Sequence, residues 1–168
     1  MKILALDFET SMLNKGDHAV GNFSADPFAG NYIICGGLAD IGTGKELWRR
    51  ETGDNVEFFV ELTKADMLVG FNLAFDLHYT IPSMWKDKLL WDCQTVQYYI
   101  ERCSKSFPSL DYTLEYYGLP AKDDYLKRAL EEGLDTLTCD QELLFKYMQQ
   151  DVRLTAELFR RQFKEVKK

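Results

Sequence analysis

An apolar run that ends in two acids, Ile3-Leu4-Ala5-Leu6-Asp7-Phe8-Glu9-Thr10, constrains the fold of this chain more than any other stretch. Its nearly unbroken apolar start predicts a strand that is buried on both faces. Because side chains alternate faces along a strand, Asp7 and Glu9 are expected to point to the same side. Two carboxylates held that close raise one another's pKa unless a cation lies between them. Paired acids at a strand end are common on protein surfaces, so their meaning depends on whether the fold brings further acids to the same point.

Length and composition predict one globular domain, residues 1–168. The chain has 168 residues and is 46% hydrophobic, which is enough for a sizeable core. No segment approaches the run of roughly eighteen apolar residues that a membrane span requires. The first residues lead directly into the strand without the architecture of a signal peptide. We therefore expect a cytoplasmic protein without a membrane partner.

The metal-ligating residue types indicate which ions this chain can hold. Four cysteines are scattered without any C-x-x-C spacing, and the chain has two histidines, His18 and His78. This pattern predicts reduced thiols rather than disulfides or a zinc site, so that any bound metal should be a hard cation on carboxylate oxygens. The net charge of -7 argues against a general nucleic-acid-coating protein. It does not exclude an enzyme that holds one strand end, because bound divalent cations invert the local charge.

Hydrophobic periodicity predicts five strands and a series of helices. The strands are expected at residues 3–10, 32–39, 46–51, 67–70 and 89–91. The helices are expected at residues 55–64, from 72 to a stop before Pro82, at 92–100, 109–117, 125–132 and 140–164. Apolar stripes at helical spacing are Val56, Phe59, Val60 and Thr63 in the first of these helices, and Leu144, Met148, Val152, Thr155 and Phe159 in the last. Residues 11–30 form a long polar segment, with turn signals at 14–17 and 26–27, that is typical of a functional loop.

The order of these elements predicts an α/β fold. The opening hairpin implies antiparallel pairing of the first three strands, and the alternating helix and strand that follow imply parallel additions to the same sheet. We expect a mixed five-stranded sheet covered by helices.

Three acidic positions stand out once the elements are placed. Asp7 and Glu9 end the first strand, and Asp76 lies one helical turn after Asn72, just beyond the fourth strand. Asp151 lies four residues after Tyr147 in the last helix, so the two side chains share a face. A Tyr-x-x-x-Asp spacing occurs by chance in such a chain, and only the joint pattern is specific.

The joint pattern resembles the three exonuclease motifs of the DEDD superfamily. The matching stretches are residues 6–10, 69–76 and 147–151, and the tyrosine four residues before the last aspartate matches the Tyr-containing (DEDDy) branch. That branch includes the proofreading domains of DNA polymerases and some 3′–5′ exoribonucleases. The resemblance implies a ribonuclease H-like fold. One landmark departs from the pattern, because Cys93 follows Asp92 where the family usually has a threonine.

The resemblance also implies roles for individual residues. Asp7, Glu9, Asp76, Tyr147 and Asp151 would be catalytic, and the four acids would hold two divalent cations, Mg²⁺ or Mn²⁺. Asp7 would bridge the two ions, Glu9 and Asp151 would complete the first site, and Asp76 would hold the second. Tyr147 would orient the attacking water, since a phenol with a pKa near 10 is a poor general base. The terminal nucleotide would be contacted by Phe8, Thr10 and Asn72.

The implied function is a 3′–5′ exonuclease that hydrolyses single-stranded or frayed 3′ ends of DNA and releases 5′-mononucleotides. RNA stays open as a substrate, because contacts to the 2′-OH cannot be seen in the sequence. The alternative of a different class is a non-catalytic nucleic-acid- or protein-binding module on this fold, although none of the acidic ligands is missing. Aspartyl phosphatases also begin with a strand ending in aspartate, but they have a second aspartate where this chain has Glu9. A separate polymerase or replication protein is an expected partner.

Overall fold

The computed structural model describes residues 1–12, 25–51, 55–103 and 106–167. Within these ranges one sheet contains β1 (Ile3–Thr10), β2 (Ile33–Asp40), β3 (Glu46–Arg50), β4 (Met67–Gly70) and β5 (Leu89–Asp92), in the spatial order β3-β2-β1-β4-β5. The pairs β1–β2 and β2–β3 are antiparallel, whereas β4 is parallel to β1 and β5 is parallel to β4. The predicted α/β class and the mixed five-stranded sheet are confirmed.

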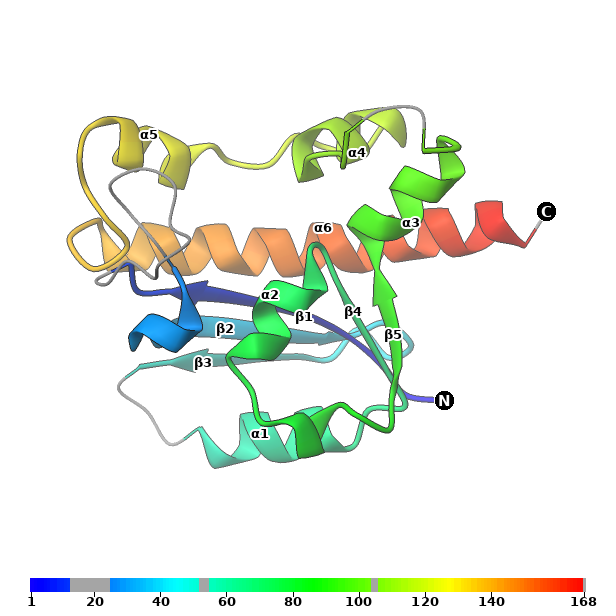
Figure 1. Ribbon diagram of the computed structural model, residues 1–168, viewed down its shortest axis with the longest axis horizontal. Coiled ribbons are helices and arrows are strands. Elements are labelled where there is room, and N and C mark those ends of the chain that lie inside the picture. Colours follow the sequence, from blue (N-terminus) through cyan, green and yellow to red (C-terminus); the bar gives the residue numbers. More distant parts are fainter. Residues whose placement is uncertain (13–24, 52–54, 104–105, 168) are drawn as a thin grey trace.

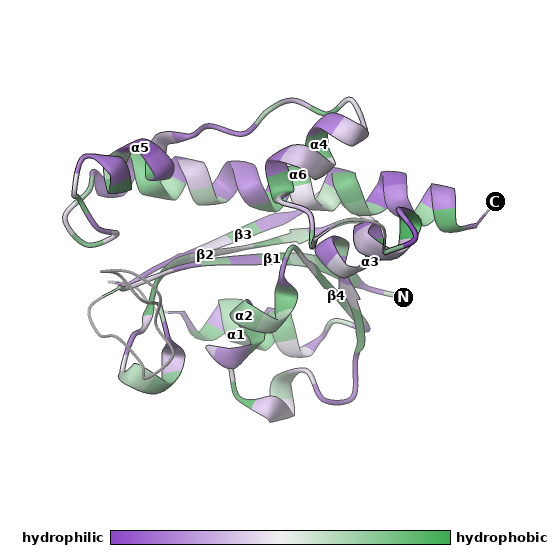
Figure 2. Cartoon of the chain, turned by 45° about the horizontal axis from the view of Figure 1, so that its top comes forward, coloured by the Kyte–Doolittle hydropathy of each residue, from purple (hydrophilic) through white to green (hydrophobic). Residues whose placement is uncertain are grey.

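Helices cover both faces of this sheet (Figure 1). The long helix α6 (Gln141–Val166) lies along one face, and α1 (Val56–Thr63) and α2 (Leu73–His78) lie on the other. Figure 2 shows the same layers from another side, with α4 (Leu110–Tyr116) and α5 (Tyr125–Glu131) beyond α6. The remaining helix α3 (Cys93–Ile100) follows β5 directly, and two short 3-10 turns, η1 (Pro27–Ala29) and η2 (Pro82–Met84), were not predicted.

The central strand β1 divides its side chains between the two layers. Leu4, Leu6 and Phe8 pack in one core cluster with Phe58 and Leu62 of α1. Ala5 packs in a second cluster with residues of α6, among them Met148, Val152 and Ala156. Since Asp7 and Glu9 follow Ala5 at alternate positions, they continue the face that α6 covers.

Two glycines in β2 let large side chains lie close to the sheet. A Cβ at Gly36 would come within 2.4 Å of the Phe8 ring. At Gly37, which pairs with Asp7, it would come within 2.5 Å of the Trp48 ring and 2.8 Å of Val152. Side chains at these positions would therefore push Phe8 away from one face and α6 away from the other.

The predicted apolar stripe of α6 is buried, but that of α1 is not. Leu144, Met148, Val152, Thr155 and Phe159 are all buried, as their spacing indicated. In α1 the buried residues are Phe58 and Leu62, while two residues of the predicted stripe, Val56 and Val60, are 66% and 44% exposed. Both faces of this short helix carry apolar residues, so periodicity could not select the inward one.

Side chains cap the starts of two helices whose first residues were predicted at 92 and 109. The carboxylate of Asp92 accepts the N–H of Gln94 at the start of α3, and Ser109 accepts that of Tyr112 at the start of α4.

All four cysteines are free, as predicted. Most of the predicted loop at 11–30, including its turn signal at 14–17, lies outside the described residues, and η1 occupies its end. No helix in the described ranges combines the length and the apolar character needed to cross a bilayer.

Candidate metal centre

Carboxylates from the two ends of the chain meet between β1 and α6. Asp7 and Glu9 reach from β1 and Asp151 from α6, and one ligand atom from each lies within 4.8 Å of the others. The approach follows from the packing described above, because Val152 lies over Gly37, the partner of Asp7 in the sheet. Asp151 is therefore held next to β1 by its neighbour on the apolar stripe.

Two oxygen atoms of this acidic group have no hydrogen-bond partner among the described residues. These atoms are Asp7 Oδ2 and Asp151 Oδ1, and both are buried. A buried acceptor without a partner costs on the order of 1–3 kcal/mol, and more if it is charged. Mg²⁺ and Mn²⁺ are hard cations that take carboxylate oxygens as ligands. The three residues therefore fit a divalent cation in both donor type and spacing.

The electrostatics of the group agree with this fit. Burial, with a further contribution from the charge of Asp151, raises the pKa of Asp7 to about 8. Burial also raises the pKa of Asp151 to about 6, although the nearby Lys122 lowers it in part. The pKa of Glu9 is raised well above its ordinary value by burial and then by Asp7 and Asp151. Without a cation, the site therefore favours protonated carboxyl groups.

Lys122 is a member of the site that sequence analysis missed. It lies between α4 and α5, and its ammonium group donates to the hydroxyl oxygen of Tyr147 at 2.6 Å. The same ammonium lies 3.5 Å from Asp151 Oδ2. No spacing links a lysine between two short helices to acids elsewhere in the chain, so the sequence held no signal for it.

Tyr147 lies beside the acids, as its spacing from Asp151 predicted. Its side chain is buried, and burial together with the charges of Asp151, Glu9 and Asp7 raises the pKa of its hydroxyl. The hydroxyl therefore stays protonated at neutral pH. Because Lys122 donates to its oxygen, the proton of Tyr147 is directed to another acceptor, and its hydrogen bond to Asp151 lowers the pKa of that carboxyl.

Asp76 is buried next to the three acids but lies outside their close group. The pairing of β1 with β4 ends at Ala5, and beyond that point Asp76 Oδ1 accepts the N–H of Phe8 at 2.9 Å. Burial, followed by the charge of Asp7, raises the pKa of Asp76 well above its ordinary value. One oxygen of Asp76 thus holds the strand that carries Asp7 and Glu9.

The three predicted substrate-binding residues lie in different surroundings. The Phe8 ring is 4% exposed and packs against Phe58 in the core, so the expected packing of this ring against a nucleotide is not supported. Thr10 is also buried, and its carbonyl accepts the hydroxyl of Thr136 at 2.7 Å. Asn72 is exposed.

Asn72 has a left-handed backbone conformation with φ of 58°, which few residues other than glycine adopt. Its N–H donates to Asp92 Oδ1 at 3.0 Å, the same oxygen that caps α3. The sequence placed Asp92 at the start of a helix but gave no sign that it fixes this turn.

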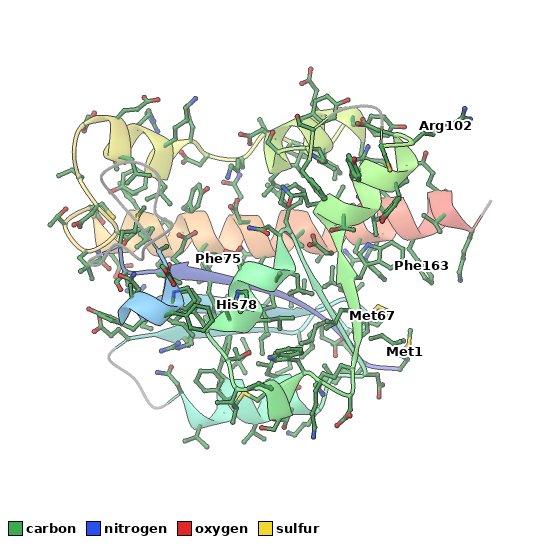
Figure 3. All side chains as sticks on the ribbon, in the orientation of Figure 1. Met1, Met67, Phe75, His78, Arg102 and Phe163 are labelled. Carbon is green, nitrogen blue, oxygen red and sulfur yellow. The ribbon has the colours of Figure 1, made fainter. Side chains whose placement is uncertain are left out.

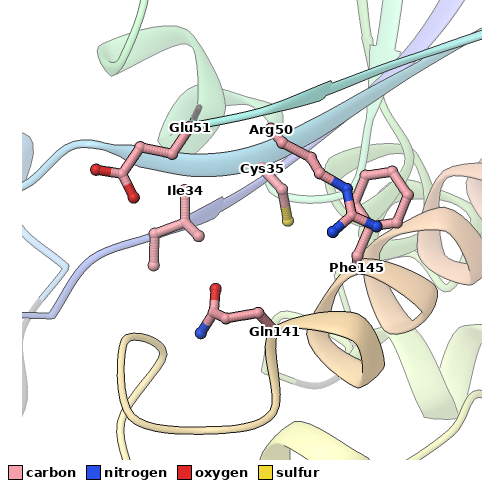
Figure 4. Close-up of a pocket in the computed structure, with 6 residues that line it drawn as sticks. All are labelled: Ile34, Cys35, Arg50, Glu51, Gln141 and Phe145. Carbon is pink, nitrogen blue, oxygen red and sulfur yellow. The ribbon is translucent and has the colours of Figure 1, made fainter. Parts of the chain in front are cut away.

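A small hollow of about 180 Å³ adjoins the acids on the side of β3 (Figure 4). Cys35, the sheet partner of Glu9, points into it, and the guanidinium of Arg50 lies 3.9 Å from the centroid of the Phe145 ring. Arg50 is also paired with Glu142, and the amide nitrogen of Gln141 donates to the backbone carbonyls of Thr136 and Cys139, just before α6. These nitrogen donors are already engaged within the protein.

No protein-family model matches this chain, and no curated protein matches it either. Its function must therefore be inferred from the arrangement of its own residues.

The raised pKa values predict that the metal-free protein becomes less stable as pH rises from 5 to 8. The folded-state pKa of about 8 for Asp7 and about 6 for Asp151 exceed the ordinary value of 3.8. The folded protein thus binds more protons than the unfolded chain in this window, and this stabilisation is lost as pH passes 6 and then 8. Acids whose pKa is lowered, such as Glu46 and Glu142, also add to the free energy of unfolding as pH rises. Their contribution is complete by about pH 5, so it does not hide the loss of stability between pH 5 and 8.

Urea unfolding in EDTA measures this loss. We expect a free energy of unfolding lower at pH 8 than at pH 5 by on the order of 1 kcal/mol or more. Asp7→Asn should flatten the dependence, whereas Asp87→Asn, at an exposed position, should keep it. A stability that is constant or rises over this range would contradict the electrostatic description of the site.

Proposed function

We propose that this chain is a metal-dependent 3′–5′ exonuclease of the Tyr-containing branch of the DEDD superfamily, with a ribonuclease H-like fold. It would hydrolyse single-stranded or frayed 3′ ends of DNA and release 5′-mononucleotides. One observation carries the proposal: Asp7, Glu9 and Asp151 converge from distant elements, with ligand atoms within 4.8 Å, and two of their buried oxygens have no partner. A surface cluster of acids would have neither property.

The arrangement of the elements supports the same family. The first acids lie on the central strand of a sheet in the order β3-β2-β1-β4-β5, and Asp76 follows β4 on a short helix. The last motif lies on the long helix that covers β1. If the acids of the three sequence motifs are to share one active site, the motifs must lie on elements arranged in this way.

Two divalent cations, Mg²⁺ or Mn²⁺, fit the proposal. Asp7, Glu9 and Asp151 would hold one ion, and Asp7 together with Asp76 would hold the second. When bound, such ions neutralise charge on the scissile phosphate and on the attacking and leaving oxygens, and they acidify water.

The residues around the acids would orient the reactants. Tyr147 keeps its proton and would position the attacking water by hydrogen bonding rather than act as a base. Lys122 fixes the Tyr147 hydroxyl from the other side and adds positive charge near the phosphate. Asn72, exposed and held in one conformation by Asp92, would contact the terminal nucleotide.

Two alternatives follow from the same residues. An exoribonuclease would use the same carboxylates and differ in contacts to the 2′-OH. A non-catalytic binding module would have no need to keep two buried and two half-buried acids whose pKa values are all raised. We therefore favour the enzyme. A net charge of -7 argues that it binds its strand weakly alone, which a partner polymerase or replication protein would compensate.

A direct assay uses 5′-labelled single-stranded DNA and RNA with Mg²⁺ or Mn²⁺. We expect a ladder that shortens from the 3′ end, with 5′-mononucleotides as products and DNA as the preferred polymer. Asp7→Asn and Asp151→Asn should abolish turnover, and the exposed control Asp87→Asn should retain it. If neither polymer is degraded with either metal, the proposed activity is wrong.

The positioning role of Tyr147 makes a separate prediction. Tyr147→Phe removes the hydroxyl but keeps the ring in its buried place, so kcat should fall by about 100-fold while KM changes little. Steady-state kinetics on a single-stranded oligonucleotide measure both values. Full activity of this variant would show that the hydroxyl does not orient the water.

A further inference from the structure

A cleft of about 470 Å³ opens on the sheet face opposite α6, at the same end of β1 as the acids. Its position follows from the register, because Ile33 in its wall pairs with Thr10, the residue after Glu9. His78 in the opposite wall follows Asp76 by two residues on α2. The cleft therefore adjoins the metal centre, although none of its lining residues belongs to the acidic group.

Arg49 of β3 lines this cleft, and one of its donors has no partner within the described residues. Its Nε is buried and has no hydrogen-bond partner among the described residues. Five of the seven arginines are ion-paired, whereas Arg49 and Arg102 form no ion pair within the described ranges; the paired ones are Arg50, Arg128, Arg153, Arg160 and Arg161. A guanidinium presents several donors in a planar fork that matches the oxygens of a phosphate.

Aromatic rings lie in the wall of this cleft and on the turn next to it. Phe28 of η1 is 83% exposed, and its ring meets that of His78 edge-on at a centroid distance of 5.6 Å. Figure 3 shows His78 on α2 beside η1. Tyr32, in the wall of the cleft, is 38% exposed.

The turn that carries Phe28 is fixed from both sides. Asp26 caps η1 by accepting the N–H of Phe28 at 2.8 Å. The hydroxyl of Tyr79 on the α2 side donates to the carbonyl of Ala25. An apolar ring exposed to water on an anchored turn is a suitable surface on which a base can stack.

We propose that this cleft binds the single-stranded nucleic acid on its way to the metal centre, with Arg49 contacting one backbone phosphate and Phe28 stacking on one base. The inference rests on the proposed function and specifies how its substrate is held. Glu51 lines the same cleft, and its charge near Arg49 repels phosphate in part, which limits the site to a single phosphate contact. Such a site favours a short segment of single strand over a duplex, because paired bases offer no free face to Phe28.

Binding of a 5′-fluorescein-labelled single-stranded DNA oligonucleotide, followed by anisotropy with Ca²⁺ in place of Mg²⁺, tests the inference. Arg49→Gln should weaken binding by about 10-fold at low salt and reduce the slope of log Kd against log salt concentration by about one. Phe28→Ala should weaken binding by about 10-fold and leave the salt slope unchanged, because stacking releases no counterions.

Two matched variants serve as controls. Arg50→Gln changes the neighbouring arginine, which is paired with Glu142 and stacked on Phe145. Phe107→Ala changes another exposed phenylalanine, which is 57% exposed and stacks on Tyr98. Both should bind the oligonucleotide as the unaltered protein does, and thermal unfolding should show all four variants folded.

The outcomes separate this inference from the proposed function. If the unaltered protein degrades the oligonucleotide with Mg²⁺ but Arg49→Gln and Phe28→Ala bind as tightly as it does, the cleft is not a substrate site and the exonuclease proposal stands. If the unaltered protein neither binds nor degrades it, the proposed function itself fails.

Discussion

Repulsion among the carboxylates of the half-buried Asp7 and Glu9 and the buried Asp151 is the interaction around which the rest of this structure is arranged. Three acids within 4.8 Å of one another, with two oxygens lacking partners, are costly in a folded protein. The surroundings offset this cost only in part, since Lys122 is the single cation near enough, among the described residues, to lie within 4.0 Å of Asp151. The repulsion that the surroundings do not offset is seen in the raised pKa values of all three acids. Under the proposed function, a divalent cation would offset this remaining repulsion.

The fold tolerates this cost because the acids are attached to well-packed elements, the central strand and the long helix that covers it. β1 lies at the centre of the sheet, with neighbours on both sides and apolar clusters on both faces. Gly37 lets Val152 come close to the strand, so Asp151 cannot withdraw without disrupting the packing of α6. Asp76 also fixes β1 in place, because its carboxylate accepts the N–H of Phe8. Preorganised ligands of this kind are what a metal-dependent hydrolase needs, because the geometry is set before the ions and the substrate arrive.

Local periodicity was sufficient to predict how the acids lie on β1 and α6. The alternation along β1 placed Asp7 and Glu9 on one face, and the apolar stripe of α6 placed Asp151 toward the sheet, as the structure shows. The inward face of α1 could not be predicted, because Phe58 and Leu62 compete with Val56 and Val60 in a helix of two turns. Lys122, the role of Asp92 at Asn72 and the unpaired Arg49 depend on contacts between distant segments, which leave no periodic signal. The Phe8 ring lies in the core because its position on β1 alternates with those of Asp7 and Glu9.

Diffraction from a crystal soaked in Mn²⁺ tests the central claim most directly, because anomalous scattering locates the ion without assuming any ligand. The account predicts an anomalous peak at coordination distance, about 2.1 Å, from Asp7 Oδ2 and Asp151 Oδ1, the two oxygens that lack partners. A crystal of Asp7→Asn soaked in the same way should show the peak weakened or absent. The unaltered protein should be soaked at Mn²⁺ concentrations that support other manganese enzymes. If no anomalous peak then appears at the acidic group, the claim that these carboxylates form a metal centre is contradicted.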